Sequence, residues 1–152
     1  MTSLVALMER VERLRASMKT VEQLDNQFLS QFKGVRKFDG VPAVAVTTDE
    51  HVFSVQTDLG IAYAHERQVI DGDRAKMEFR FIVKVEDLEA EVLRLYLDHS
   101  GSFTRADGSE FGPFNQASTA KDIAVAVIHG ILESELYAPS PAFVTYQGVS
   151  LQ

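Results

Sequence analysis

Apolar residues near the start of the chain recur in alternating steps of three and four. They stand at Leu4, Leu7, Val11, Leu14, Met18, Val21, Phe28 and Phe32, with Asp25 at the one skipped step. This spacing is typical of a helix that packs in a bundle or a coiled coil. Thr2 or Ser3 can cap its start, and Gly34 is a favourable stop. The pattern therefore predicts one long amphipathic helix over residues 1–33.

The length of this helix bears on oligomeric state. At 1.5 Å per residue it would span about 45 Å, whereas a compact domain of 152 residues has a diameter of about 38 Å. An apolar stripe longer than the body must bend or overhang, so we expect a second copy to cover it. The residues expected in that contact are Leu7, Val11, Leu14, Met18 and Val21. The alternative is a break near Asp25, which would give two shorter helices in an ordinary core.

After Gly34 the pattern changes to strands. Segments 41–48, 51–57, 60–69, 75–85 and 93–97 are rich in β-branched and aromatic residues. The connections between them are short, and Asp71-Gly72-Asp73 is a strong hairpin signal. Parallel neighbours need long crossovers, so these strands must be antiparallel. We predict a meander of about five to six strands over residues 41–105.

A second helix is indicated near the end of the chain. Thr119 and Asp122 have the spacing of a capping box, and apolar residues follow at helical steps. The pattern predicts a buried helix over 119–137 and a short last strand at 143–146. The order of elements predicts a single α+β domain over residues 1–152.

Composition narrows the class of protein. Apolar residues make up 45% and charged residues 24% of the chain, as in ordinary globular domains. The formal net charge of -7 opposes binding to nucleic acid or to an anionic membrane. The absence of cysteine removes disulfides and the strongest zinc ligands, and fits a reducing cytoplasm, although a periplasmic protein without disulfides would look the same. The first fifteen residues lack the unbroken apolar run of a signal peptide. We therefore expect a cytoplasmic protein with neither nucleic-acid nor membrane partners.

Few residues suggest chemistry. Asp98, His99 and Ser100 bring a carboxylate, an imidazole and a hydroxyl together. Neighbours on a strand point to opposite faces, however, so a turn is the better interpretation than a catalytic group. His129 lies in the most apolar predicted helix, where a core or interface position is more common than ligand binding. No spacing matches a zinc motif, a calcium loop or a phosphate-binding loop, so we expect neither metal nor cofactor.

One group of residues suggests a small-molecule site on the sheet. Its members alternate along predicted strands: Tyr63, His65, Arg80, Arg94, Tyr96 and Asp98. If their faces coincide, aromatics and cations together can hold a small organic anion. The alternative is a solvated sheet face with cross-strand pairs such as Arg94 with Glu78.

These patterns rank the hypotheses about function. The first is a non-enzymatic oligomeric protein that acts through protein association by its N-terminal helix. The second is a small-molecule-binding protein, or a small hydrolytic enzyme, that uses the sheet-face group. The third is an acidic partner of a basic protein, of the immunity, chaperone or inhibitor type, which the net charge permits.

Overall fold

A continuous helix, α1 (Leu4–Ser30), begins the fold in the computed structural model, which describes residues 3–48 and 52–140. The side-chain oxygen of Ser3 caps the helix by accepting a hydrogen bond from the Ala6 amide at 3.1 Å. The helix passes through Asp25 without a break, so the two-helix alternative is wrong. It ends before Gly34, because the Phe32 carbonyl accepts a hydrogen bond from the Thr47 amide at 3.1 Å and joins the sheet.

Eight antiparallel strands follow in one sheet, and each pairs with its neighbours in sequence. They are β1 (Gly34–Lys37), β2 (Ala43–Thr47), β3 (Phe53–Thr57), β4 (Gly60–Asp71), β5 (Arg74–Val85), β6 (Leu88–Leu97), β7 (Ser102–Thr104) and β8 (Glu110–Pro113). The predicted α+β class and antiparallel sheet are confirmed, but the strand count is higher than expected. The first strand escaped prediction because all four of its residues are exposed and carry no apolar alternation.

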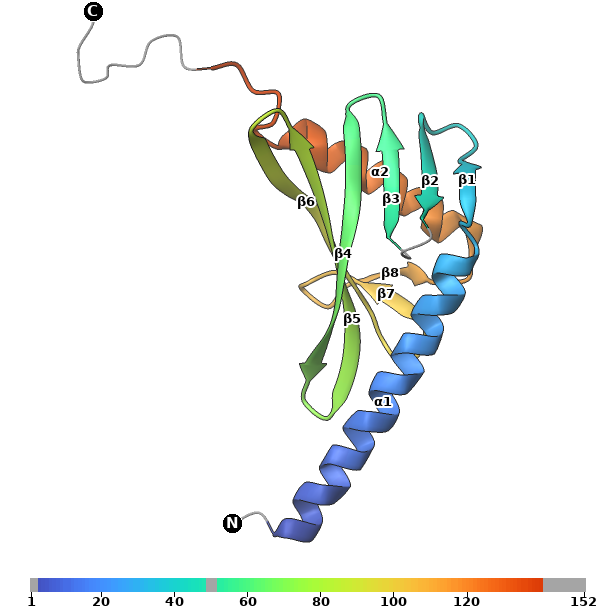
Figure 1. Cartoon of the computed structure of the whole chain (residues 1–152), viewed down its shortest axis with the longest axis vertical. Helices are drawn as coiled ribbons and strands as arrows, with labels where there is room; N and C mark the ends of the chain where they lie inside the picture. The colour runs from blue at the N-terminus through green and yellow to red at the C-terminus, as the bar shows by residue number, and fades with distance from the viewer. Residues whose placement is uncertain (1–2, 49–51, 141–152) are drawn as a thin grey trace, which may run out of the picture.

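The hairpin of β4 and β5 is the longest pairing in the sheet. Its ladder extends from Ala62 opposite Val83 to Asp71 opposite Arg74, and a two-residue loop joins the strands as predicted. On its other side, β4 pairs with β3 only as far as Tyr63. Residues 64–71 of β4 therefore have a neighbouring strand on one side alone within the described part of the chain. The hairpin tip lies beside α1, and the N-terminal end of α1 runs past it (Figure 1).

The second helix, α2 (Ala117–Glu133), covers the inner face of the sheet at the end away from the hairpin tip (Figure 1). Its cap residue is Gln116, which makes no side-chain capping bond. The predicted capping box is therefore wrong. Thr119 lies inside the helix because it packs against the β8 backbone: its hydroxyl is 2.5 Å from where a side chain on Gly112 would begin. The strand predicted at 143–146 lies outside the described residues.

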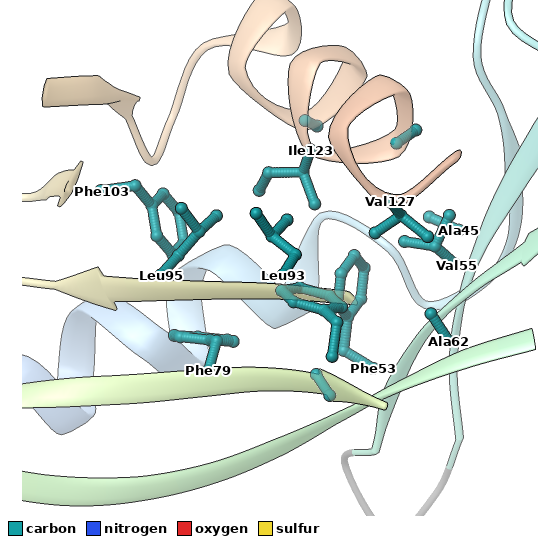
Figure 2. Packing of buried hydrophobic residues seen from close by; sticks show 14 of the residues in the cluster. Ala45, Phe53, Val55, Ala62, Phe79, Leu93, Leu95, Phe103, Ile123 and Val127 are labelled. Atoms are coloured by element: carbon teal, nitrogen blue, oxygen red, sulfur yellow. The ribbon is translucent and has the colours of Figure 1, made fainter. Parts of the chain in front are cut away.

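The core is built around phenylalanine, between the last turns of α1, the inner face of the sheet and α2. The Phe28 ring of α1 lies 5.0 Å from Phe103 and 5.3 Å from Phe53 between centroids, in edge-to-face contact. Figure 2 shows Phe53 and the neighbouring strand residues facing Ile123 and Val127 of α2. These contacts join both helices to one side of the sheet, and no helix among the described residues covers the other side.

The close approach of α2 to β6 depends on Gly130. A side chain at this position would begin 2.1 Å from the Val92 carbonyl oxygen, a backbone atom that cannot move aside alone. We predict that Gly130→Ala lowers the free energy of unfolding by about 1–3 kcal/mol through overpacking, although alanine favours a helix by about 1 kcal/mol over glycine. Chemical denaturation measures this loss. Lys121→Ala, on the exposed side of the same helix, should stay within about 0.5 kcal/mol of wild type, and an equal effect of both variants would contradict the contact.

Candidate functional site

The predicted sheet-face residues lie largely together on the side of the sheet away from the helices. The strand register places His65 opposite Arg80, and Arg80 opposite Arg94. Tyr63 lies two residues before His65 on the same face of β4 and has 45% of its surface exposed. Tyr96 occupies the corresponding face of β6. The geometry thus presents two guanidinium groups and aromatic side chains on one surface.

Both guanidinium groups already have carboxylate partners within the chain. Glu91 accepts hydrogen bonds from Arg80 and Arg94, each at 2.7 Å. The bond from Arg94, opposed by partial burial and helped by Arg80, lowers the pKa of Glu91 below its ordinary value. A bulge at Val92 brings Glu91 to this face, because Phe81 pairs with Leu93 while Ile82 pairs with Glu91. An incoming anion would have to compete with Glu91 for both arginines.

A second carboxylate on the same face, Glu78, is buried. It accepts a hydrogen bond from Arg67 at 3.1 Å and one from the Tyr96 hydroxyl at 3.3 Å. The cross-strand pair expected between Arg94 and Glu78 is therefore replaced by Arg67 with Glu78, since Arg94 turns to Glu91. The use of this face as an organic-anion site stays a prediction.

Asp98 leaves the sheet face and organises a turn. Its carboxylate accepts hydrogen bonds from the Ser100 amide at 2.9 Å, the Ser100 hydroxyl at 2.6 Å and the Ser102 amide at 3.1 Å. Burial opposes its charge, but these bonds prevail and lower the pKa of Asp98. The Ser100 hydroxyl thus bonds to Asp98, while His99 contacts Arg74. The turn interpretation is confirmed.

His129 is exposed on α2, so of the two expected positions, core or interface, the core is wrong and the interface stays a prediction. It borders an open cleft of about 480 Å³ between α2 and β6, together with Arg105, Glu110, Asp122 and Glu133. The periodicity of α2 did not reveal this, because Val125, Ala126 and Gly130 line the same cleft and are only half-buried although none of them is polar. Across the described ranges, no three histidine or acidic side chains gather in a way that could hold a metal ion.

The apolar seam of α1 is divided between the core and the surface. Val21 is fully buried, as are Phe28 and Leu29 below it. Toward the N-terminus the seam emerges from the protein. Its exposed members are Leu4, Leu7, Met8, Val11 and Met18, and Leu14 is half-buried. Because Val21 is buried in the core of its own chain, its predicted place in the contact with a second copy is wrong. The rest of that prediction concerns the residues from Leu7 to Met18.

Polar contacts hold this half of α1 against the β4–β5 hairpin. Arg10 forms an ion pair with Asp73 at 2.8 Å, and the Ser17 hydroxyl accepts a hydrogen bond from the Ala75 amide at 2.7 Å. The Gln68 side chain donates to the Met18 carbonyl at 3.1 Å. These bonds turn the polar side of the helix toward the hairpin. The apolar seam lies beside that contact and is left uncovered by the described part of the chain.

A pair of carboxyl groups lies between α1 and β4. Asp25, the polar step in the seam, is buried, and Glu66 on the inner face of β4 is hydrogen bonded to it. Burial, the bond to Asp25 and the charge of Asp25 together raise the pKa of Glu66 to about 10. The pair therefore holds one proton at neutral pH, in the hydrogen bond between the two carboxyl groups. The sequence signalled one partner as a defect in the seam but gave no sign of the other.

This pair makes stability depend on pH. In the unfolded chain Glu66 ionises near pH 4.5, whereas in the folded chain it ionises near pH 10. Folding thus takes up a proton between these values, and the free energy of unfolding falls as pH rises through that window. The neutral amide introduced by Glu66→Gln has no such proton to take up. We predict that Glu66→Gln stabilises the protein by about 1–3 kcal/mol at pH 8, and that the gain vanishes below pH 4.5.

Thermal unfolding followed by circular dichroism between pH 4 and pH 10 measures this effect. Glu89→Gln, at an exposed position on β6, serves as the matched control and should follow wild type throughout. Identical pH profiles for wild type and Glu66→Gln would refute the protonated pair.

Comparisons with known proteins add nothing to the evidence from the geometry. The chain matches no protein-family model, no curated protein and no solved structure. Neither α1 nor α2 is both long and apolar enough to cross a membrane, and no other helix occurs among the described residues.

Proposed function

We propose that this protein is non-enzymatic and acts by association with a second copy of itself through the N-terminal half of α1. The observation that carries the proposal is the exposed seam of Leu7, Val11 and Met18, which continues the stripe that packs into the core from Val21 onward. Burial of such apolar surface in an interface contributes a favourable free energy of about 25 cal/mol per Å². A contiguous exposed stripe on a rigid helix is typical of a contact surface.

Charge favours a second copy as the partner. Between residues 4 and 20 there are four basic and two acidic side chains, whereas the rest of the chain has eleven basic and twenty acidic ones. The overhanging segment is therefore positive and the body is strongly negative. A copy of the same chain offers an acidic surface for the helix, and its own helix finds the same surface in return.

Symmetry adds a physical reason for a closed dimer. In a two-fold arrangement both seams are buried and no apolar seam stays exposed. A head-to-tail arrangement would leave one seam exposed at each end of the assembly, which could then grow into a fibre. The ion pair of Arg10 with Asp73 holds the helix on its own hairpin. The seam is thus presented to a partner in one orientation, without the entropy cost of ordering a free segment.

Light scattering after size exclusion tests this proposal. At micromolar concentration the wild type should have twice the chain mass of 16.9 kDa. Leu7→Glu with Val11→Glu should give a monomer with unchanged thermal stability, because both side chains are exposed in the single chain. Val35→Glu with Leu132→Glu adds the same charges at exposed apolar positions elsewhere and should remain dimeric.

Three outcomes would overturn the proposal. They are a wild-type monomer at micromolar concentration, a Leu7→Glu/Val11→Glu variant that stays dimeric, and a monomer whose helix binds phosphatidylserine vesicles instead. The last outcome would assign the basic, apolar segment to an anionic membrane surface.

A further inference from the structure

The open edge of β4 offers a second contact for the same partner. We propose that residues 65–71 of β4 pair antiparallel with the same segment of a second copy, around a two-fold axis at Gln68, so that two sheets become one. This inference rests on the proposed self-association and names the geometry of its interface. Adding a strand to an exposed edge is a general mode of protein recognition.

The strand register shows which backbone groups face outward. Asp71 and Arg74 flank the two-residue loop, and residues at these positions of a hairpin exchange both backbone hydrogen bonds. The odd-numbered residues of β4 therefore bond to β5, in agreement with the Ala75 amide, which bonds to Ser17 instead. The even-numbered residues Glu66, Gln68 and Ile70 consequently direct their amide and carbonyl groups to the other side. The pairing with β3 ends at Tyr63, so these groups form an open row in the described structure.

α1 crosses the inner face of the hairpin and contacts mainly β5. The Gln68 side chain reaches the Met18 carbonyl, which places the inner face of β4 next to the seam. Ile70, two residues farther on the same face, is 61% exposed. A partner that pairs with the edge would also cover Ile70.

Area favours an interface larger than the helix alone. The exposed part of α1, residues 4–18, forms a strip about 22 Å long and about 10 Å wide. A stable dimer buries about 800 Å² on each partner. The helix strip falls well short of this area, whereas a shared sheet edge adds main-chain hydrogen bonds and the apolar surface of Ile70.

The edge is complementary to itself in one register. With the axis at Gln68, the opposed pairs are Glu66 with Ile70, Arg67 with Val69, and His65 with Asp71, so no like charges face each other. An axis at Arg67 would oppose two guanidinium groups, and an axis at Glu66 would oppose two carboxyl groups. An axis nearer the hairpin loop would leave fewer residues to pair. The axis at Gln68 therefore combines the longest pairing with an absence of repulsion.

Cross-linking tests the geometry directly, because the native chain has no cysteine. In the proposed pairing the two Gln68 Cα atoms lie about 5.5 Å apart. Gln68→Cys treated with a short bismaleimide linker should therefore yield a covalent dimer in high yield at micromolar concentration. Glu89→Cys is the control, since Glu89 pairs with Lys84 at the far end of β5 from the hairpin loop. Equal yields from both variants would overturn the inference.

A proline substitution tests the edge hydrogen bonds. Gln68→Pro removes an outward amide without breaking the ladder to β5, and proline is tolerated at a strand edge. It should weaken dimerisation by at least about ten-fold in Kd. Gln68→Ala loses the side chain but keeps the amide, and should dimerise like wild type. If Gln68→Pro fails to fold, the cross-linking result decides the question.

The two proposals fail in different ways. A wild-type monomer would remove both of them. A dimer that Leu7→Glu/Val11→Glu dissociates, but that neither cross-links at Gln68→Cys nor weakens with Gln68→Pro, would remove the edge pairing and leave the helix contact in place.

Discussion

The packing of Phe28 into the inner face of the sheet is the contact on which the arrangement of this protein depends. Its ring touches Phe32, just beyond the end of α1, and phenylalanines from β3, β5 and β7, with centroids between 5.0 and 5.9 Å away. Contacts of this size dominate core energetics because aromatic rings bury large apolar areas. This cluster secures only the last turns of α1, and the rigidity of the helix then carries its first half along the β4–β5 hairpin and past its tip (Figure 1).

Polar contacts decide how that first half is turned. The Arg10–Asp73 ion pair is exposed and contributes little to stability by itself. Together with the hydrogen bonds at Ser17 and between Asp25 and Glu66, however, it selects one rotation of the helix about its axis. A buried carboxyl pair costs stability when it loses its proton, so its benefit lies in orientation more than in energy. The exposed seam is a consequence of this orientation.

The predicted sheet-face site shows which features of a sheet surface strand alternation can predict and which it cannot. Alternation correctly placed Tyr63, His65, Arg80, Arg94 and Tyr96 on strands, and the register brings the middle three into one row. It could not foresee the bulge at Val92, because one extra residue leaves no mark in composition. Because of that bulge, Glu91 lies within hydrogen-bond distance of Arg80 and Arg94. Asp98 departed from the row because its local hydrogen bonds to Ser100 and Ser102 turn the chain.

The long helix, the antiparallel sheet and the buried second helix can be predicted from the sequence, because each has a strong local period or a short connection that permits one pairing. The sequence also locates the seam and the polar residue that interrupts it, Asp25. The folded structure is needed to see which part of the seam is buried, where β3 stops and leaves β4 open, and which carboxylate meets Asp25. These features depend on contacts between residues far apart in the chain, and local patterns carry no information about such distances.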